Sequence, residues 1–355
     1  MKDSILHKIK DDGLDSLTFQ LTKKCNFNCI FCGQAVSRLI KKEQYELSRE
    51  KVSEALNDAK RLGVKIINIT GGEPTLRPDL ISIITEASSL GLKVNLLTNG
   101  YALTESYCKE LINAGLSHLG VSYHSPFENQ HDEICSAPGS FLRLNKGIRY
   151  FKSIKPDVNI RATFTLNSLN YFDSYRMLIL AKKIGIDCVN FAQIVSLDNI
   201  MDNDLKLSED QIKEFYFKIV PLLLRDGKRF WIKAIIEPLF PSLQDKPLAH
   251  QIRRLIEHPD DFEKEIDCYF NEDYNCGLYN SLPCITALHS SRIQSNGEVT
   301  ICCDSEDANF NLGNINDQRF YNIWNSIKYK KIRDINFYPK SNLCRICKRK
   351  FIQVK

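Results

Sequence analysis

The 355-residue sequence has no hydrophobic run long enough to cross a membrane, because its strongest apolar stretch, residues 219–224, is short and interrupted by proline. Its first residues contain no apolar core of the kind that signal peptides carry. The sequence also lacks a strong excess of one charge, since 48 basic and 43 acidic residues leave a formal net charge of +5. That charge is too small to indicate a surface that follows nucleic-acid phosphates. We therefore expect a cytoplasmic protein that binds neither a membrane nor nucleic acid.

Low-complexity segments are absent too, because 43% of the residues are hydrophobic and 26% are charged, which is the usual balance of a globular chain. Cysteine, in contrast, is abundant: there are 13, an odd number in a chain without an export signal. That count argues against a disulfide framework. Each thiol is then either a small buried hydrophobic side chain or a metal ligand, and the spacing of the cysteines has to decide between the two.

Strand-like and helix-like patterns alternate through the first half of the chain. Short apolar or period-two runs predict strands over residues 16–22, 65–70, 93–98, 118–124, 158–165 and 187–195. Amphipathic runs predict helices over residues 48–62, 78–90, 104–114, 141–151 and 171–184. This order predicts an α/β fold with a parallel sheet and helices on its outer face. Because six strands are fewer than the eight of a closed barrel, we expect a partial (β/α)6 TIM-like barrel, with a doubly wound open sheet as the alternative.

The alternation stops beyond the sixth predicted strand. A capping box formed by Ser208 and Gln211 predicts one more helix, and Asn296-Gly297 predicts a tight hairpin between two short strands. We expect a partial barrel over residues 1–210, helices and linker that recognise substrate over residues 211–283, and a small cysteine-rich domain over residues 284–355.

Three cysteines follow the first predicted strand directly. Cys25, Cys29 and Cys32 have the spacing C-x3-C-x2-C. Three thiolates on a tight loop suit an iron–sulfur cluster and leave one iron open, whereas a structural zinc site normally takes four protein ligands. The residues alone leave two other readings open, a zinc knuckle and three unrelated core cysteines.

With Phe31 as the aromatic residue before the last cysteine, this motif resembles the signature of the radical S-adenosylmethionine (SAM) enzymes. The resemblance implies a [4Fe–4S] cluster on the three cysteines, with the open iron chelated by the methionine part of SAM, and it places Phe31 among the cofactor-binding residues. It also implies an electron donor such as flavodoxin or ferredoxin. One-electron reduction then cleaves SAM and gives a 5′-deoxyadenosyl radical, which takes a hydrogen from the substrate.

A glycine-rich segment ends the second predicted strand and reads Thr-Gly-Gly-Glu-Pro over residues 70–74. Glycines there allow a ligand to approach the backbone closely, and the carboxylate of Glu73 can accept a hydrogen bond from an ammonium group. The segment resembles the GGEP motif of the same family, which implies that Gly71, Gly72 and Glu73 bind the amino group of SAM. Taken alone, it is equally an ordinary glycine-rich turn.

Polar residues at the carboxyl ends of the other predicted strands are further candidates, because catalytic residues of parallel βα sheets collect there. The resemblance implies that Ser122, Arg161 and Gln193 bind the ribose and carboxylate of SAM. Residues 98–100 stand at the end of the third strand, and His124 is either a substrate contact or a histidine satisfied inside the fold. The alternative for the whole set is that these polar groups satisfy the barrel interior.

A second group of cysteines lies near the C-terminus, at Cys284, Cys302, Cys344 and Cys347. By chemistry alone four such thiolates suit either zinc or a [4Fe–4S] cluster. The spacing around Gly297 resembles the SPASM and twitch extensions of radical SAM enzymes, which implies an auxiliary [4Fe–4S] cluster. Because no cysteine follows Cys347, we expect a single auxiliary cluster, as in the twitch arrangement.

The remaining cysteines have no such spacing. We expect Cys108 and Cys188 to be core residues, while Cys303 stands beside Cys302 as an alternative ligand. Three others could face the active-site mouth and return a hydrogen atom to a substrate radical, namely Cys135, Cys268 and Cys276. For each of these three, the plain alternative is a structural thiol.

The sequence indicates the chemistry better than the substrate. We expect a radical SAM oxidoreductase in which the auxiliary cluster assists oxidation or dehydrogenation of a small molecule such as a sugar or cyclitol. The alternative enzyme is a peptide maturase that performs epimerisation, thioether or carbon–carbon bond formation on a ribosomally made precursor. Many such maturases carry an N-terminal peptide-recognition domain, and the start of the cysteine motif at residue 25 favours the small molecule. Outside enzymes, the alternative is a zinc or iron–sulfur binding protein without turnover.

Overall fold

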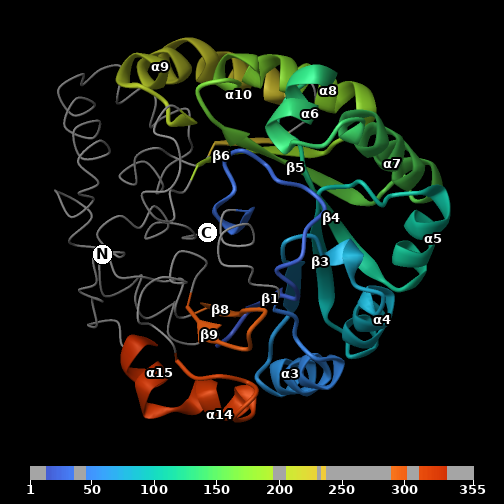
Figure 1. Cartoon of the computed structure of the whole chain (residues 1–355), viewed down its shortest axis with the longest axis vertical. Helices are drawn as coiled ribbons and strands as arrows, with labels where there is room; N and C mark the ends of the chain where they lie inside the picture. Colours follow the sequence, from blue (N-terminus) through green and yellow to red (C-terminus); the bar gives the residue numbers. More distant parts are fainter. Residues whose placement is uncertain are drawn as a thin grey trace.

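The computed structural model describes residues 13–35, 45–194, 205–229, 233–236, 289–301 and 312–333. Within them a single sheet is surrounded on its outer side by helices (Figure 1). Its strands are β1 (Ser16–Gln20), β2 (Ile66–Thr70), β3 (Lys93–Thr98), β4 (Leu116–Ser122), β5 (Asn159–Leu166), β6 (Cys188–Gln193), β7 (Lys233–Ile236), β8 (Ser290–Ile293) and β9 (Val299–Thr300). No helix of these described residues has the length and apolar character needed to cross a bilayer.

The order of the strands is β7-β6-β5-β4-β3-β2-β1-β8-β9. All neighbours from β7 to β8 are parallel, and only β8 and β9 pair antiparallel. The sheet ends at β7 on one side and β9 on the other, so it is curved but not closed within the part of the chain that is described (Figure 1). The predicted parallel α/β fold with an open, partial barrel is confirmed.

The helices cover the convex face of the sheet in chain order (Figure 1). They are α3 (Arg49–Arg61), α4 (Leu80–Ser89), α5 (Glu105–Asn113), α6 (Glu128–Cys135), α7 (Ser140–Ile154), α8 (Ser174–Ile184), α9 (Glu209–Glu214) and α10 (Val220–Arg229), with α14 (Phe320–Asn325) and α15 (Ile327–Arg333) near the end of the chain. Short 3-10 turns are η1 (Pro74–Leu76) and η2 (Tyr171–Asp173), and the π-helix η4 (Phe215–Ile219) joins α9 to α10.

Local signals in the sequence explain where several helices begin. The Ser48 side chain accepts a hydrogen bond from the backbone N–H of Lys51 at the start of α3, and Thr104 caps α5 in the same way. The predicted capping box of Ser208 and Gln211 is present with both of its hydrogen bonds and opens α9.

The two faces of the sheet differ in chemistry, because successive strand residues point to opposite sides. Fully buried apolar residues such as Phe19 and Ile67 face the helices and form the core. The opposite, inner face carries polar residues in register across neighbouring strands: Thr18 pairs with Asn68, and Asn68 pairs with Asn95. The Nδ2 of Asn95 donates a hydrogen bond of 3.0 Å to Oδ1 of Asn68.

Three features differ from the sequence-based expectation. Helix α6 occupies the stretch after β4 that was expected to be a loop. A seventh parallel strand, β7, pairs with β6 inside a proline-punctuated region in which no strand was expected. The predicted Asn296-Gly297 hairpin is present, with Gly297 at a φ of 89°, but its first strand joins the main sheet beside β1. The proposed domain boundaries at residues 210 and 283 stay predictions.

Candidate active site

The C-x3-C-x2-C motif lies on the loop that leaves the carboxyl end of β1 and crosses the edge of the sheet (Figure 1). Cys25, Cys29 and Cys32 are half-buried cysteines. The backbone N–H of Phe27 donates to Sγ of Cys25 at 3.4 Å, and the N–H of Cys32 donates to the carbonyl of Cys29 at 3.0 Å. Hydrogen bonds to sulfur stabilise the thiolate form and tune the potential of a cluster, so this loop is shaped for metal-bound sulfur.

The glycines of the Thr-Gly-Gly-Glu-Pro segment lie directly against this loop. The N–H of Gly72 donates to the carbonyl of Thr22 and the N–H of Glu73 to the carbonyl of Lys24, each at 2.7 Å. A Cβ on Gly71 would lie 2.7 Å from the Thr22 oxygen, and one on Gly72 would overlap the oxygen of Lys24. The close approach that needs glycine here is therefore the packing of two backbone segments. A direct contact of these glycines with SAM stays a prediction.

Glu73 ties the end of β2 to the end of β3. Its carboxylate is 1% exposed. One oxygen accepts hydrogen bonds from the N–H and hydroxyl of Thr75 and from the hydroxyl of Thr98, and the other accepts from the N–H of Asn99 at 2.7 Å. Burial raises the pKa of Glu73, and these hydrogen bonds oppose the rise. The structure thus gives the carboxylate a positioning role, and its predicted contact with the SAM ammonium stays a prediction.

A second link joins β3 to the interior of the cysteine motif. The Nδ2 of Asn99 donates to Oδ1 of Asn26 at 2.8 Å, and the Oδ1 of Asn99 accepts from the N–H of Tyr101 at 3.0 Å. The rings of Tyr101 and Phe27 meet edge to face with centroids 5.6 Å apart. The loop between the first two cysteines is therefore fixed by both a polar and an aromatic contact.

Helix α6 supports the loop from the other side. The N–H of Ile30 donates to the carbonyl of Ile134 at 3.0 Å. The Phe31 ring of the motif meets the imidazole of His124 edge to face at 4.7 Å, and that imidazole stacks on His131 at 6.1 Å. Burial lowers the pKa of His124 to about 3 and that of His131 to about 4, so both rings are neutral at pH 7. His124 is thus a satisfied, buried histidine.

Cys135 ends α6 and is 1% exposed. Its sulfur lies 3.6 Å from Nε2 of His131. It belongs to a small buried cluster with Phe27 and Ala137, against which Cys25, Cys29 and Tyr101 pack. The sequence left open whether this thiol faces the active-site mouth or is structural. The structure buries it in the packing beneath the cysteine loop, and a role as hydrogen donor to substrate stays a prediction.

The other strand-end candidates lie at different distances from the carboxyl edge of the sheet. Ser122 ends β4, half-buried, and Gln193 ends β6, so both stand at the carboxyl edge. Arg161 is only the third residue of β5, pairs with Gly120, and has an exposed side chain. Arg161 therefore lies further from the carboxyl edge than Ser122, and the contacts of Ser122, Arg161 and Gln193 with SAM stay predictions.

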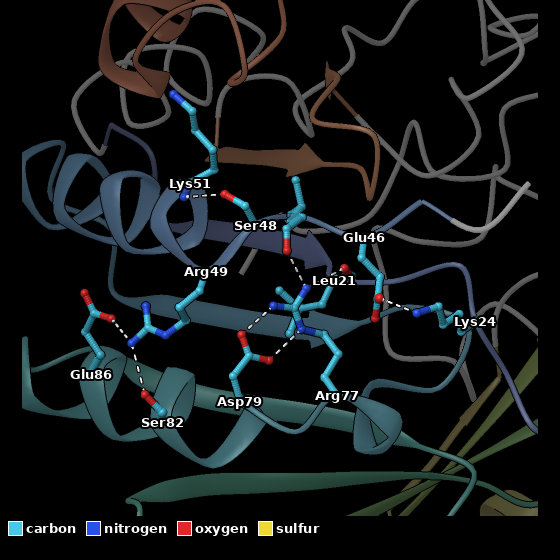
Figure 2. Close-up of polar contacts among 11 residues, drawn as sticks. Leu21, Lys24, Glu46, Ser48, Arg49, Lys51, Arg77, Asp79, Ser82 and Glu86 are labelled. Atoms are coloured by element: carbon cyan, nitrogen blue, oxygen red, sulfur yellow. Dashed lines mark hydrogen bonds and ion pairs between the residues drawn. The ribbon is translucent and has the colours of Figure 1, made fainter.

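Sequence analysis missed Arg77, which closes the base of the loop (Figure 2). Its guanidinium is almost fully buried and donates to the carbonyls of Leu21 at 3.1 Å and Leu47 at 2.6 Å. The same group forms two parallel hydrogen bonds with the carboxylate of Asp79, at 2.8 and 2.6 Å, which lower the pKa of that carboxyl. The available signal was an arginine and an aspartate two residues apart, directly after the glycine-rich segment.

The two ends of the cysteine-bearing segment are also joined to each other. Thr22 and Glu46 form an antiparallel bridge, and the N–H of Leu47 donates to the carbonyl of Leu21 at 3.1 Å. Lys24 and Glu46 form an ion pair of 2.5 Å (Figure 2). Leu21 and Leu47 thus lie side by side, and Arg77 donates to the carbonyls of both residues.

The donor set suits an iron–sulfur cluster, because its three ligands are cysteines on one loop. Among the described residues, no three His, Cys, Asp or Glu side chains are grouped so as to hold one metal ion. A [4Fe–4S] cluster spreads its thiolates over different irons, so Cys25, Cys29 and Cys32 need not converge on one point. Such a cluster, when bound there, supplies one electron and an open iron for a ligand.

The other predicted sulfur ligands and hydrogen donors lie outside the described residues. These are Cys268, Cys276, Cys284, Cys302, Cys303, Cys344 and Cys347.

Comparison with protein families agrees with the geometry of the loop. The family model of the radical SAM superfamily matches residues 19–206, which is more than half of the chain. The chain belongs to the radical SAM superfamily. The model of an iron–sulfur cluster-binding domain, SPASM, matches residues 284–348. Membership implies SAM and a [4Fe–4S] cluster, and the SPASM match implies auxiliary iron–sulfur binding by the C-terminal part.

The named relatives are distant, and their names describe different reactions. An AdoMet-dependent heme synthase of Methanosarcina barkeri is 30% identical over 48% of this chain, and the match spans 47% of that protein. A heme synthase of Oleidesulfovibrio alaskensis is 24% identical over 88% of this chain and 75% of its own length. A probable GTP 3′,8-cyclase of Saccharolobus solfataricus is 28% identical over 58% of this chain and 67% of its own length.

Two solved radical SAM structures share the fold. Streptococcus suis SuiB bound to S-adenosylmethionine superposes with a TM-score of 0.68 at 17% identity, covering 98% of this chain and 76% of SuiB. The structure of anSMEcpe with bound AdoMet superposes with a TM-score of 0.63 at 18% identity, covering 90% of this chain and 79% of that protein. At these identities the likeness concerns the fold alone.

Proposed function

We propose that this chain reductively cleaves SAM at a [4Fe–4S] cluster held by Cys25, Cys29 and Cys32, and that the 5′-deoxyadenosyl radical so formed takes a hydrogen from substrate. One observation carries the proposal: residues 71–73 contact the cysteine loop and fix it to the edge of the sheet. An electron carrier of the flavodoxin or ferredoxin class supplies the electron.

For the substrate we propose a small polar molecule, such as a sugar or cyclitol, that undergoes oxidation or dehydrogenation. The inner face of the sheet supports this choice, because Thr18, Asn68 and Asn95 line it with hydrogen-bonding groups rather than apolar ones. The relatives called heme synthase and GTP 3′,8-cyclase are also named for small molecules. An auxiliary [4Fe–4S] cluster on the C-terminal cysteines would assist by accepting an electron from the substrate radical.

The second candidate is a peptide maturase that epimerises or cross-links a precursor. One observation favours it: SuiB bound to its precursor peptide SuiA superposes with a TM-score of 0.67 and covers 98% of this chain. Because the identity is 17%, that likeness is one of fold. Incorporation of solvent deuterium at a stereocentre of the product would favour epimerisation, whereas a product oxidised by two electrons would favour dehydrogenation.

The test of the radical chemistry compares the intact enzyme with a variant in which Cys25, Cys29 and Cys32 are all alanine. We expect dithionite-reduced enzyme to form 5′-deoxyadenosine from SAM and the triple variant to form none. Cys108→Ala is the matched control, because this fully buried thiol lies on α5 away from the loop. Retained SAM cleavage in the triple variant would refute the site. No cleavage in the loaded wild-type enzyme would instead leave an iron–sulfur binding protein without turnover.

A further inference from the structure

Two glutamines end neighbouring parallel strands at the edge that carries the cysteine loop. Gln20 is the last residue of β1, and Gln294 directly follows β8. Phe19 pairs with Ile293 in the register of these two strands, so the residues that follow them, Gln20 and Gln294, are also neighbours. Phe19 and Ile293 are fully buried in the core on the helix side. By strand alternation, Gln20 and Gln294 face the inner side of the sheet.

The amide nitrogens of both glutamines are buried donors without an acceptor. Gln20 is 0% exposed and Gln294 is 4% exposed, yet neither Nε2 has a hydrogen-bond partner in the part of the chain that is described. The hydroxyl of Ser295, 1% exposed, is also unpaired there. Buried polar groups in native proteins almost always have partners, so three such groups on adjacent residues call for a ligand.

The orientation of the Gln20 amide is fixed by a contact of its own. Its Oε1 accepts a hydrogen bond of 3.3 Å from the backbone N–H of Ser295. If the amide were turned over, its NH₂ group would face another N–H donor. The Nε2 of Gln20 is therefore the atom that points away from Ser295, and its two hydrogens are available to another group.

We propose that Gln20, Gln294 and Ser295 form a binding site for a carboxylate group of the substrate, which narrows the small polar substrate of the proposed function to one that carries an acidic group. Among the described residues, both Nε2 groups and the Ser295 hydroxyl have hydrogens without an acceptor, and Oε1 of Gln20 already accepts from the N–H of Ser295. An ionised carboxylate can accept from both amide nitrogens and from the Ser295 hydroxyl together, whereas a hydroxyl ligand has its own proton to donate and finds only Oγ of Ser295 among these unpaired atoms to accept it. Arg292 stands two residues before Gln294 on the same face of the sheet.

The site lies where a substrate of the proposed radical reaction has to bind, and the inference rests on that proposed function. Gln20 pairs with Thr70, the residue before the glycines that clamp the cysteine loop. Along the chain, Gln20 leads into the motif that begins at Cys25, and Gln294 leads into the hairpin before Cys302. A carboxylate held here would anchor the substrate beside the edge at which the radical forms.

The experiment uses the full-length enzyme, anaerobically loaded with iron and SAM, and trifluoroacetate as the carboxylate probe, followed by ¹⁹F NMR. Gln20→Glu keeps the oxygen that accepts from Ser295 but replaces the donor by a carboxylate oxygen. We expect it to raise the dissociation constant of trifluoroacetate by about tenfold or more, since a hydrogen bond to a charged group is lost. Gln318→Glu is the matched control, because it introduces the same charge at an exposed glutamine and should leave binding unchanged.

Gln294→Met is a second variant that removes an unpaired donor without adding charge. We expect it to weaken trifluoroacetate binding while its melting temperature stays equal to that of the wild type or rises, which a purely structural glutamine would not show. Equal binding of trifluoroacetate by wild type, Gln20→Glu and Gln294→Met would overturn the proposal. Absence of binding by the wild type would overturn it too, because water or the chain itself would then satisfy the donors. Dithionite-driven formation of 5′-deoxyadenosine is measured in the same samples and reports separately on the radical chemistry. If the enzyme binds trifluoroacetate but forms no 5′-deoxyadenosine, the proposed function is refuted and the carboxylate site is retained.

Discussion

Asn99 and Asn26 join the end of β3 to the interior of the cysteine motif through one amide–amide hydrogen bond of 2.8 Å. Asn99 is 8% exposed, and its other amide atom accepts from the backbone of Tyr101, so the side chain is held at both ends. Its backbone N–H in turn donates to Glu73. A residue outside the motif therefore connects the cysteine loop, β3 and the glycine-rich segment.

Asn99→Ala should weaken retention of the N-terminal cluster more than it weakens the fold. The substitution removes the contact with Asn26 and costs about 1 kcal/mol of unfolding free energy, the usual net value of one hydrogen bond. Asn68→Ala is the matched control, because it removes an amide–amide hydrogen bond of 3.0 Å from the inner face of the sheet. We expect faster iron loss to a chelator in Asn99→Ala only. Equal rates in both variants would show that the Asn99 contact does not hold the loop.

Arg77→Lys should destabilise the protein by about 3 kcal/mol, because lysine cannot replace a buried guanidinium that serves two carbonyls and one carboxylate. The comparison is Arg49→Lys, whose ion pair with Glu86 is partly exposed and should contribute less than about 1 kcal/mol (Figure 2). Urea unfolding of the two variants measures the difference. A similar loss of unfolding free energy in both variants would mean that Arg77 contributes no more to stability than a surface ion pair does.

The sequence predicted what depends on local patterns and failed where distant segments meet. The parallel strands, the capping box at Ser208 and the Asn296-Gly297 hairpin follow from alternation and short-range hydrogen bonding, and all were expected. Strand β7 is only four residues long, so its pairing with β6 and not its composition makes it a strand. Arg77 could not be assigned from spacing either, because its carbonyl partners lie 56 and 30 residues away.

Within the candidate site, the motif residues were predictable and their supports were not. Cys25, Cys29 and Cys32 could be identified because their spacing reflects a single loop. For Cys135 the sequence left two readings open, a thiol at the active-site mouth and a structural thiol, because a sequence does not reveal that the residue ends a helix packed beneath that loop. Its burial against Phe27 arises from tertiary packing alone.

The C-terminal cysteines lead to a prediction about iron content. If Cys284, Cys302, Cys344 and Cys347 bind one auxiliary [4Fe–4S] cluster, the reconstituted enzyme should hold about eight irons. Cys302→Ala should reduce that number to about four, whereas Cys303→Ala should leave it unchanged. Iron and zinc analysis of the anaerobic protein checks both variants. About four irons with bound zinc in the wild type would contradict the auxiliary cluster, and more than eight would indicate a second auxiliary cluster.

His124 and His131 predict a loss of stability in mild acid. The Nδ1 of His124 accepts from the N–H of Thr165 at 3.3 Å, and that of His131 accepts from the N–H of His124 at 3.2 Å, so protonation of either ring would break a backbone hydrogen bond. Their folded-state pKa values of about 3 and about 4 lie below the ordinary 6.5. The unfolded chain therefore binds more protons below pH 6.5, and stability falls as the pH drops towards these values.

The size of this effect follows from proton linkage. Between pH 6.5 and pH 4.5, each histidine should lower the free energy of unfolding by about 2 kcal/mol, because the unfolded form gains a proton and the folded form does not. His131→Asn should remove its share of this pH dependence, so urea unfolding at the two pH values should show a shallower decline than in the wild type. His118→Asn is the control, since His118 is exposed and should contribute a much smaller slope. An unchanged decline in His131→Asn would mean that this ring is already charged in the folded protein, which its hydrogen bond with the backbone of His124 argues against.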